Sequence, residues 1–154
     1  MLQCTAVTDV PYYEALLALT TMEGGPGYPA EVLEEDEFLL CELGEHDESA
    51  EHAAYLWAAD TVEDQDLWLL WTGSDAHRVY RFEVRPLCPA RLRHLATGKV
   101  DTCAYSDRHP GPHSFFVTDP LGEIVKSREE RKTSGGRDAD GDADGDADGD
   151  VDDP

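Results

Sequence analysis

Apolar side chains recur at helical spacing near the start of the chain. Tyr12, Leu16 and Leu19 are separated by three or four residues, which is the repeat of one face of an α-helix. Asp9 precedes this run and suits the N-cap position. The Gly-Gly-Pro-Gly segment at residues 24–27 follows it and favours chain reversal. The pattern therefore predicts a helix that begins after Asp9 and ends before Gly24.

The rest of the first half carries weaker signals. We expect a short strand at residues 3–7 and a short acidic helix at residues 29–36. The apolar run at residues 38–43 fits a buried strand or a helix end, and periodicity does not separate these alternatives. In residues 50–60, one narrow apolar face is formed by Ala50, Ala53, Ala54 and Trp57, which predicts a third helix.

The period changes to two in the second half. Residues 67–72 are almost uniformly apolar, as in a central strand buried on both faces. Residues 77–85 alternate, which predicts a half-buried strand. A short helix is expected at residues 90–96, and three further strands are expected at residues 100–105, 114–118 and 123–126. Together these elements predict an α+β domain over residues 1–126, with N-terminal helices packed on a mostly antiparallel sheet that is formed largely by the second half.

Charge divides the 154 residues unevenly. The chain has 34 acidic residues against 12 Lys and Arg, a net charge of −22. Residues 1–76 hold eighteen acids and no Lys or Arg, whereas residues 77–126 have a net charge of +3. This acid excess, with Arg replacing most Lys, resembles the proteins of organisms that keep molar salt in the cytoplasm. Such salt screens the self-repulsion of a highly charged chain.

The last 28 residues differ in kind from the rest. Residues 127–154 have a net charge of −7 and include three consecutive Asp-Ala-Asp-Gly repeats. A segment with so little to bury is expected to be a disordered acidic tail. Asp140, Asp142, Asp144 and Gly145 match the front half of an EF-hand loop, but Val151 stands where a bidentate Glu is needed. We therefore expect bulk cations around the tail rather than a specific calcium site.

No signal peptide and no apolar run long enough to cross a membrane is evident in the sequence. The four cysteines are dispersed and contain no Cys-x-x-Cys pair. We therefore expect a cytoplasmic protein with reduced, mostly buried thiols.

One loop gathers several reactive side chains. Cys103, Asp107, His109 and His113 lie within eleven residues and are the candidate catalytic residues. A zinc site would need three or four donors, with Cys88 or His94 as additional ligands, and a Cys nucleophile would need one His beside it. The alternative is a core cysteine next to a Pro-Gly-Pro turn that carries two exposed histidines. The spacing matches no known ligand pattern closely, so the sequence assigns no metal and no cofactor.

Basic residues are concentrated in the second half. The candidate anion-binding or partner-binding residues are Arg78, Arg81, Arg85, Arg91 and Arg93. They either neutralise the acidic first block, bind nucleic acid, or dock an acidic protein. The leading hypothesis is therefore a small accessory or regulatory protein that binds a protein or a phosphate-bearing partner through an Arg-rich sheet surface.

Two alternatives remain. The first is a small enzyme or metal-binding domain centred on residues 103–113. The second is a winged-helix DNA-binding regulator, in which residues 50–60 would form the recognition helix. That segment contains two acids and no Lys or Arg, which opposes insertion between phosphates.

Overall fold

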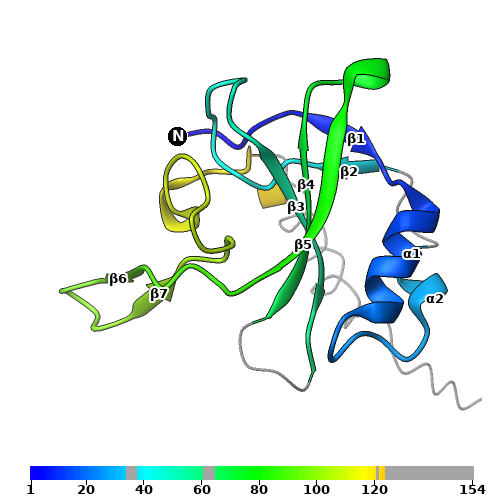
Figure 1. Cartoon of the computed structure of the whole chain (residues 1–154). Helices are drawn as coiled ribbons and strands as arrows, with labels where there is room; N and C mark the ends of the chain where they lie inside the picture. Colours follow the sequence, from blue (N-terminus) through cyan, green and yellow to red (C-terminus); the bar gives the residue numbers. More distant parts are fainter. Residues whose placement is uncertain (34–37, 61–64, 121, 124–154) are drawn as a thin grey trace, which may run out of the picture. The chain divides into compact units, whose positions relative to one another are not determined.

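The computed structural model of the chain describes residues 1–33, 38–60, 65–120, 122 and 123. These residues form a mixed α+β structure (Figure 1). In chain order the elements are β1 (Val7–Asp9), α1 (Tyr12–Thr21), α2 (Pro29–Leu33), β2 (Phe38–Leu40), β3 (His52–Ala58), β4 (Asp66–Thr72), the 3-10 helix η1 (Asp75–His77), β5 (Val79–Arg85), β6 (Arg91–Arg93), β7 (Val100–Thr102) and the 3-10 helix η2 (Ser114–Phe116).

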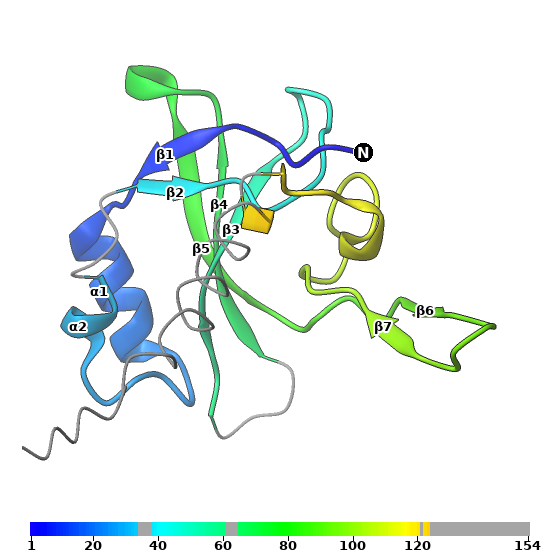
Figure 2. The ribbon, with the colours of Figure 1, turned by 180° about the vertical axis from the view of Figure 1, so that it is seen from behind.

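All the strand pairs of the described residues are antiparallel, but they form three small sheets rather than one. The largest has the order β3-β4-β5, and β1-β2 and β6-β7 are two-stranded ribbons. The α+β class is therefore confirmed. The expected single sheet is not, and four of the seven strands among the described residues lie within residues 1–77. Figure 2 shows the same arrangement from behind.

Strand β4 is the centre of the core, as its apolar run predicts. Its residues from Asp66 to Trp71 are all buried, and it pairs on both sides, with β3 and with β5. Trp68 and Trp71 are 0% and 1% exposed. Because Trp68 and Trp71 are three positions apart, they point to opposite faces of the sheet. Both faces of β4 are therefore covered, although the sheet has only three strands.

Helix α1 lies where the sequence predicts it. It begins at Tyr12 and ends before Gly24. The expected N-cap is wrong, because Pro11 occupies that position and Asp9 is the last residue of β1. The buried residues of α1, Ala15 and Leu19, belong to the same hydrophobic cluster as the two tryptophans of β4. Helix α2 covers the first five residues of the expected helix at 29–36, and positions 34–37 lie outside the described residues.

The expected helix at residues 50–60 is wrong, because this segment is strand β3. His52 to Ala58 pairs with β4 over its whole length, with a register shift between Tyr55 and Trp57. The helical propensity of its alanines is outweighed by burial against β4, where Ala53 and Ala54 are 2% and 1% exposed. The recognition helix required by the winged-helix alternative is thus a strand.

Two further expectations are also wrong. Residues 90–96 contain strand β6, which pairs with β7, instead of a helix. Residues 114–118 contain the 3-10 helix η2 instead of a strand, and the Ser114 hydroxyl accepts a hydrogen bond from the Ala104 amide at 2.8 Å. Both segments are short and adjoin Cys or His residues whose long-range contacts override local propensity.

The chain divides into two units at residue 119. The second unit contains the expected strand at 123–126 and the acidic tail at 127–154, which lie outside the described residues except for Glu123. Among the described residues, no helix is long and apolar enough to cross a membrane.

Candidate metal centres

The four cysteines and four of the six histidines come together in two groups of the same composition. Centre 1 consists of Cys4, Cys41, His46 and His52, and centre 2 consists of Cys88, Cys103, His109 and His113. Within each group, one donor atom from every residue lies within 4.8 Å of the others. One Cys of each centre is fully buried and the other three residues are half-buried.

Centre 1 forms where the β1-β2 ribbon continues beyond its last paired residues. Cys4 precedes β1, and Cys41 directly follows β2. The Cys4 amide donates to the Leu43 carbonyl and the Cys41 amide donates to the Ala6 carbonyl, both at 2.8 Å. These two bonds extend the antiparallel ladder and bring the two thiols together. His46 and His52 then enter from the following loop and from the first position of β3.

Centre 2 repeats this construction at the base of the β6-β7 hairpin. The Cys88 amide donates to the Tyr105 carbonyl at 2.8 Å, and the Cys103 amide donates to the Ala90 carbonyl at 3.0 Å. As in centre 1, each Cys amide bonds the carbonyl two residues beyond the other Cys. His109 and His113 lie on the loop that follows Cys103. The same local motif is therefore built twice from unrelated stretches of sequence.

The distances between donor atoms fit one tetrahedral ion in each centre. A tetrahedral Zn²⁺ with Zn–S of about 2.3 Å and Zn–N of about 2.05 Å needs S···N edges of about 3.6 Å and an N···N edge of about 3.3 Å. In centre 1 the S···N contacts are 3.5 Å (Cys4 to His52) and 3.6 Å (Cys41 to His46). In centre 2, Cys88 to His113 and Cys103 to His109 are both 3.5 Å, and the two histidines are 3.2 Å apart.

The imidazole rings are oriented in the same way in both centres. His46 and His109 point Nε2 at the thiols, whereas His52 and His113 point Nδ1 at them. The remaining nitrogen of His46 lies 3.0 Å from the Asp47 carbonyl, and that of His109 lies 3.2 Å from the Pro110 carbonyl. A carbonyl at this position accepts the Nδ1–H and leaves Nε2 unprotonated as a ligand, which is the usual outer contact of a metal-binding histidine.

The donor atoms of both centres are partly buried and lie near backbone amide hydrogens. Burial raises the pKa of Cys41 to about 12, while the backbone N–H groups of Ala53 and Leu43 oppose that shift. Burial also raises the pKa of Cys88, opposed by the N–H of Ala90. Such thiols stay protonated until a cation displaces the proton. Burial lowers the pKa of His52 and of His109, which keeps both rings neutral and able to donate a lone pair.

The structure brings together three of the four residues that the sequence singles out in the 103–113 loop. Cys103, His109 and His113 meet at centre 2, and Cys88 completes the group, whereas Asp107 does not join it. The Asp107 carboxylate lies 3.7 Å from the Arg108 guanidinium instead. His94, the other ligand considered, bonds the Asp101 carboxylate at 2.7 Å.

Centre 1 has no counterpart in the sequence predictions. Its ligands span residues 4–52, and nothing local connects Cys4 to Cys41. One signal was available: Cys-x4-His-x5-His at residues 41–52 and Cys-x5-His-x3-His at residues 103–113 are variants of one pattern. Each pattern is preceded at a distance by a single additional Cys. The four cysteines of the chain are therefore the number that two Cys2His2 sites require.

The five candidate arginines divide into two sets. Arg78 donates to the Thr8 hydroxyl and to the Asp9 carbonyl, Arg81 pairs with Glu51 and Glu83, and Arg85 pairs with Glu83. Arg91 and Arg93 are exposed on β6 and have no ion pair among the described residues.

The two centres are in contact through their loops. A Cβ placed on Gly44, in the loop of centre 1, would lie 2.8 Å from both Pro112 Cγ and Val117 Cγ2. The N-terminal segment also lies between the two loops, since the Glu45 amide bonds the Leu2 carbonyl and the Gln3 amide bonds the Thr118 carbonyl. Ordering one loop thus supplies a packing surface for the other.

Comparisons with protein families, with curated proteins and with solved structures find no match to this chain. The two centres and the surface around them are therefore the features that indicate function.

Proposed function

We propose that the chain is a zinc-binding protein with two structural Cys2His2 centres that hold together a small partner-binding module. The observation that carries this proposal is the repeated donor set, in which S···N separations of 3.5–3.6 Å equal the edges of a zinc tetrahedron. Two thiolates with two imidazoles in tetrahedral arrangement favour Zn²⁺ over the hard cations Mg²⁺ and Ca²⁺.

The donor count favours a structural role. Catalytic zinc keeps one coordination position for water or substrate, whereas structural zinc is bound by four protein ligands. Each centre offers four. The alternative of a Cys103 nucleophile loses support for the same reason, because Cys103 lies in a group with two imidazoles and a second thiol. A nucleophile needs one base and an open approach for the substrate.

The region around centre 2 needs a bound metal ion in order to fold. Among residues 86–118, only Cys103, Tyr105 and Ser106 are buried, and regular structure is limited to β6, β7 and η2. So few buried side chains cannot offset the chain entropy of an ordered segment, and small segments of this kind usually rely on metals or disulfides. Zinc would supply the missing stabilisation and fix the hairpin at its base.

The cellular role that fits this architecture is that of an accessory or regulatory protein that works by binding. The strong negative charge favours a salt-adapted cytoplasm as its setting. Screening at high ionic strength offsets the repulsion among the acids of residues 1–76.

The test is the metal content of protein purified without chelators, measured by atomic emission. We expect two zinc ions per chain, and one ion per chain after either Cys4→Ser or Cys103→Ser. The matched controls are His77→Gln and His94→Gln, because these are the two histidines outside the centres. Both controls should keep two ions.

Replacement of zinc by Co²⁺ gives a second readout, since tetrahedral thiolate-bound Co²⁺ absorbs strongly in the visible range. Protein that takes up no stoichiometric zinc or cobalt would refute the proposal. An equal loss of metal in the histidine controls would refute the assignment of the ligands.

A further inference from the structure

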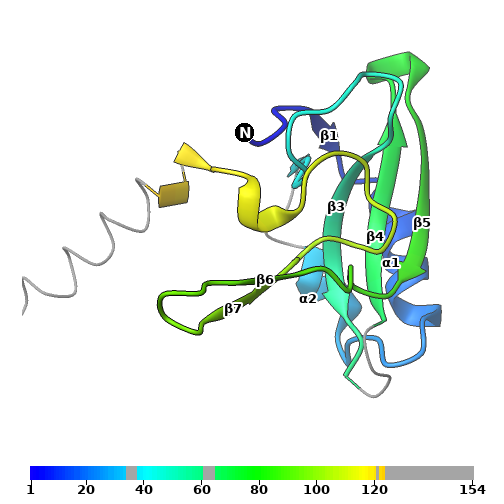
Figure 3. The same ribbon diagram turned by 90° about the vertical axis from the view of Figure 1, so that its left-hand side faces the viewer.

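The β6-β7 hairpin is held at its base by centre 2 and is otherwise largely free of the other elements. Cys88 precedes β6 and Cys103 follows β7, so the two cysteines close the ribbon at one end. At the other end the Gly98 amide bonds the His94 carbonyl at 2.7 Å and closes the turn. Figures 1 and 3 show the hairpin extending away from the three-stranded sheet. A ribbon fixed in this way loses little further freedom when it binds a partner.

One face of this ribbon carries positive charge that has no ion pair within the part of the chain that the structure describes. Arg91 and Arg93 are two positions apart on one strand and therefore share a face, and both are exposed. Directly opposite them in register are Thr102 and Val100, which add no acid to this face. The one acid of the hairpin, Asp101, is bonded by His94 and Lys99 at 2.7 and 2.9 Å. The guanidinium groups of this face are thus available to an anionic partner.

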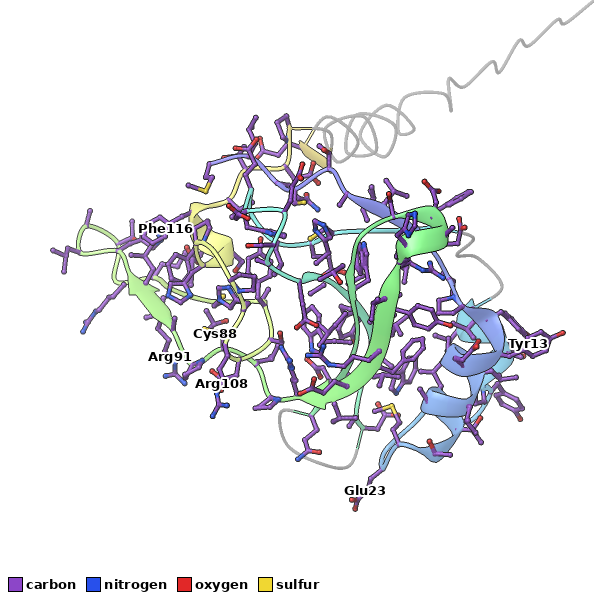
Figure 4. The ribbon with its side chains drawn as sticks, turned by 45° about the horizontal axis from the view of Figure 1, so that its top comes forward. Tyr13, Glu23, Cys88, Arg91, Arg108 and Phe116 are labelled. Carbon is purple, nitrogen blue, oxygen red and sulfur yellow. The ribbon has the colours of Figure 1, made fainter. Side chains whose placement is uncertain are left out.

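The excess of positive charge is local to the β6-β7 hairpin. Residues 88–103 have three Lys or Arg and one acid, a net charge of +2, in a chain of −22. A zinc ion bound by two thiolates adds no net charge. Arg108 also lies near centre 2 with a side chain that is 92% exposed, but the Asp107 carboxylate 3.7 Å away offsets its charge. In Figure 4, Arg91 and Arg108 both extend outward near Cys88.

We propose that the β6-β7 hairpin binds duplex DNA by entering the major groove, with Arg91 and Arg93 on the phosphates. A two-stranded β-ribbon is one of the elements that this groove admits. The two arginines are spaced about 6.6 Å along the strand, so they can contact separate phosphates. The inference rests on the proposed function, because zinc at centre 2 is needed to hold the hairpin.

The composition of the Arg-bearing face distinguishes this partner from the others. Single strands are bound by stacking on exposed aromatic rings, and this face has none, since Thr102 and Val100 lie opposite the arginines. Duplex RNA has a major groove too narrow for a ribbon. A protein partner would call for a large anchor beside the arginines, whereas the large exposed apolar side chain of the hairpin, Leu95, lies in the turn beyond β6. The acids of residues 1–76 would repel phosphate elsewhere on the surface and limit DNA to the hairpin.

The test is fluorescence anisotropy of the full zinc-loaded chain with a labelled 16-base-pair DNA duplex, in KCl from about 50 mM to about 2 M, so that the range includes the high salt that the acid excess favours. Arg91→Gln combined with Arg93→Gln should weaken binding at least tenfold and reduce the slope of log K against log[KCl] by about 2. The matched control, Arg81→Gln with Arg85→Gln, removes the same charge from arginines that are paired within the fold and should change affinity less than twofold.

Zinc content and tryptophan fluorescence are measured on every sample, so that loss of a centre or of the fold is recognised separately. Two bound zinc ions and a folded chain without DNA binding at 50 mM KCl would overturn the hairpin inference and leave the zinc proposal standing. Tighter binding to single-stranded DNA, to duplex RNA or to a poly-glutamate peptide, or an equal loss in the control pair, would also overturn it.

Discussion

If the two centres bind zinc as proposed, the contact between their loops predicts that the two ions bind cooperatively. A substitution at Gly44 tests this cooperativity. Gly44 lies between Cys41 and His46 of centre 1, yet an added Cβ would meet Pro112 and Val117, which lie on either side of His113 of centre 2 in the sequence. Gly44 has no left-handed φ, so the effect of Gly44→Ala is steric and not conformational.

The size of the effect follows from the geometry. The new methyl group would lie 2.8 Å from two side-chain carbons, whereas carbon atoms pack at about 3.5–4.0 Å. One loop must therefore shift by roughly 0.7–1.2 Å, and overpacking of this kind costs about 1–3 kcal/mol. The clash exists only when both loops are ordered, so the cost falls on the second zinc ion. We expect its affinity to fall between about fivefold and about 150-fold.

The assay is a zinc titration against a chromophoric chelator, with Gly27→Ala as the control. A Cβ on Gly27 would meet nothing within 4 Å, and Gly27 also lacks a left-handed φ. In a Cys4→Ser background, which retains only centre 2, Gly44→Ala should have a much smaller effect on the remaining ion, as a double-mutant cycle requires. A Gly44→Ala titration that superimposes on that of the unchanged protein would refute the coupling.

Four further outcomes are expected. Leu69→Ala, at a fully buried site in β4, should lower the free energy of unfolding by about 2–5 kcal/mol in denaturant titrations, and a loss below 1 kcal/mol would contradict its place in the core. The midpoint of thermal unfolding should rise steadily from 0.1 to 2 M KCl because salt screens the acid excess, and a flat response would argue against salt adaptation. The hydrogen bonds from Arg85 and Arg81 lower the pKa of Glu83, so its contribution to stability should be complete above the ordinary carboxyl pKa of 4.5 and lost as the pH falls below it. The free energy of unfolding of the unchanged protein should exceed that of Glu83→Gln by under about 1 kcal/mol, because Glu83 is 40% exposed. Deletion of residues 127–154 should leave the zinc content and the unfolding midpoint unchanged, and a cooperative loss of structure would refute the domain boundary at residue 126.

The elements that sequence periodicity predicted well are those whose partners lie in the core. The apolar run of β4 and the amphipathic spacing of α1 each reflect burial against the hydrophobic cluster, and burial is what periodicity records. Prediction failed for β3, β6 and η2. Strand β3 is itself buried against β4, and its prediction failed because its alanines carry helical propensity. In contrast, β6 and η2 lie near a Cys or His of centre 2, and their conformations follow from long-range contacts that leave no periodic trace. For β6 and η2, few buried side chains exist to produce a pattern.

The sequence predicted the two centres only in part. Centre 2 draws three ligands from eleven residues, and this local density identified Cys103, His109 and His113 without their partner Cys88. Centre 1 joins residues 37 positions apart in the sequence, Cys4 and Cys41, through a ladder that depends on the pairing of β1 with β2. No spacing rule covers such a distance.

The stronger signal is that the order Cys-His-His follows an isolated Cys twice in the sequence. The simplest explanation for this repeat is that both segments bind the same kind of metal ion. The structure adds what spacing lacks: the same reciprocal amide bonds between the cysteines, and the same carbonyl behind one histidine, in both centres. The two centres thus share a backbone geometry although the residues between their cysteines and histidines differ. This agreement supports metal binding independently of the number of donor atoms.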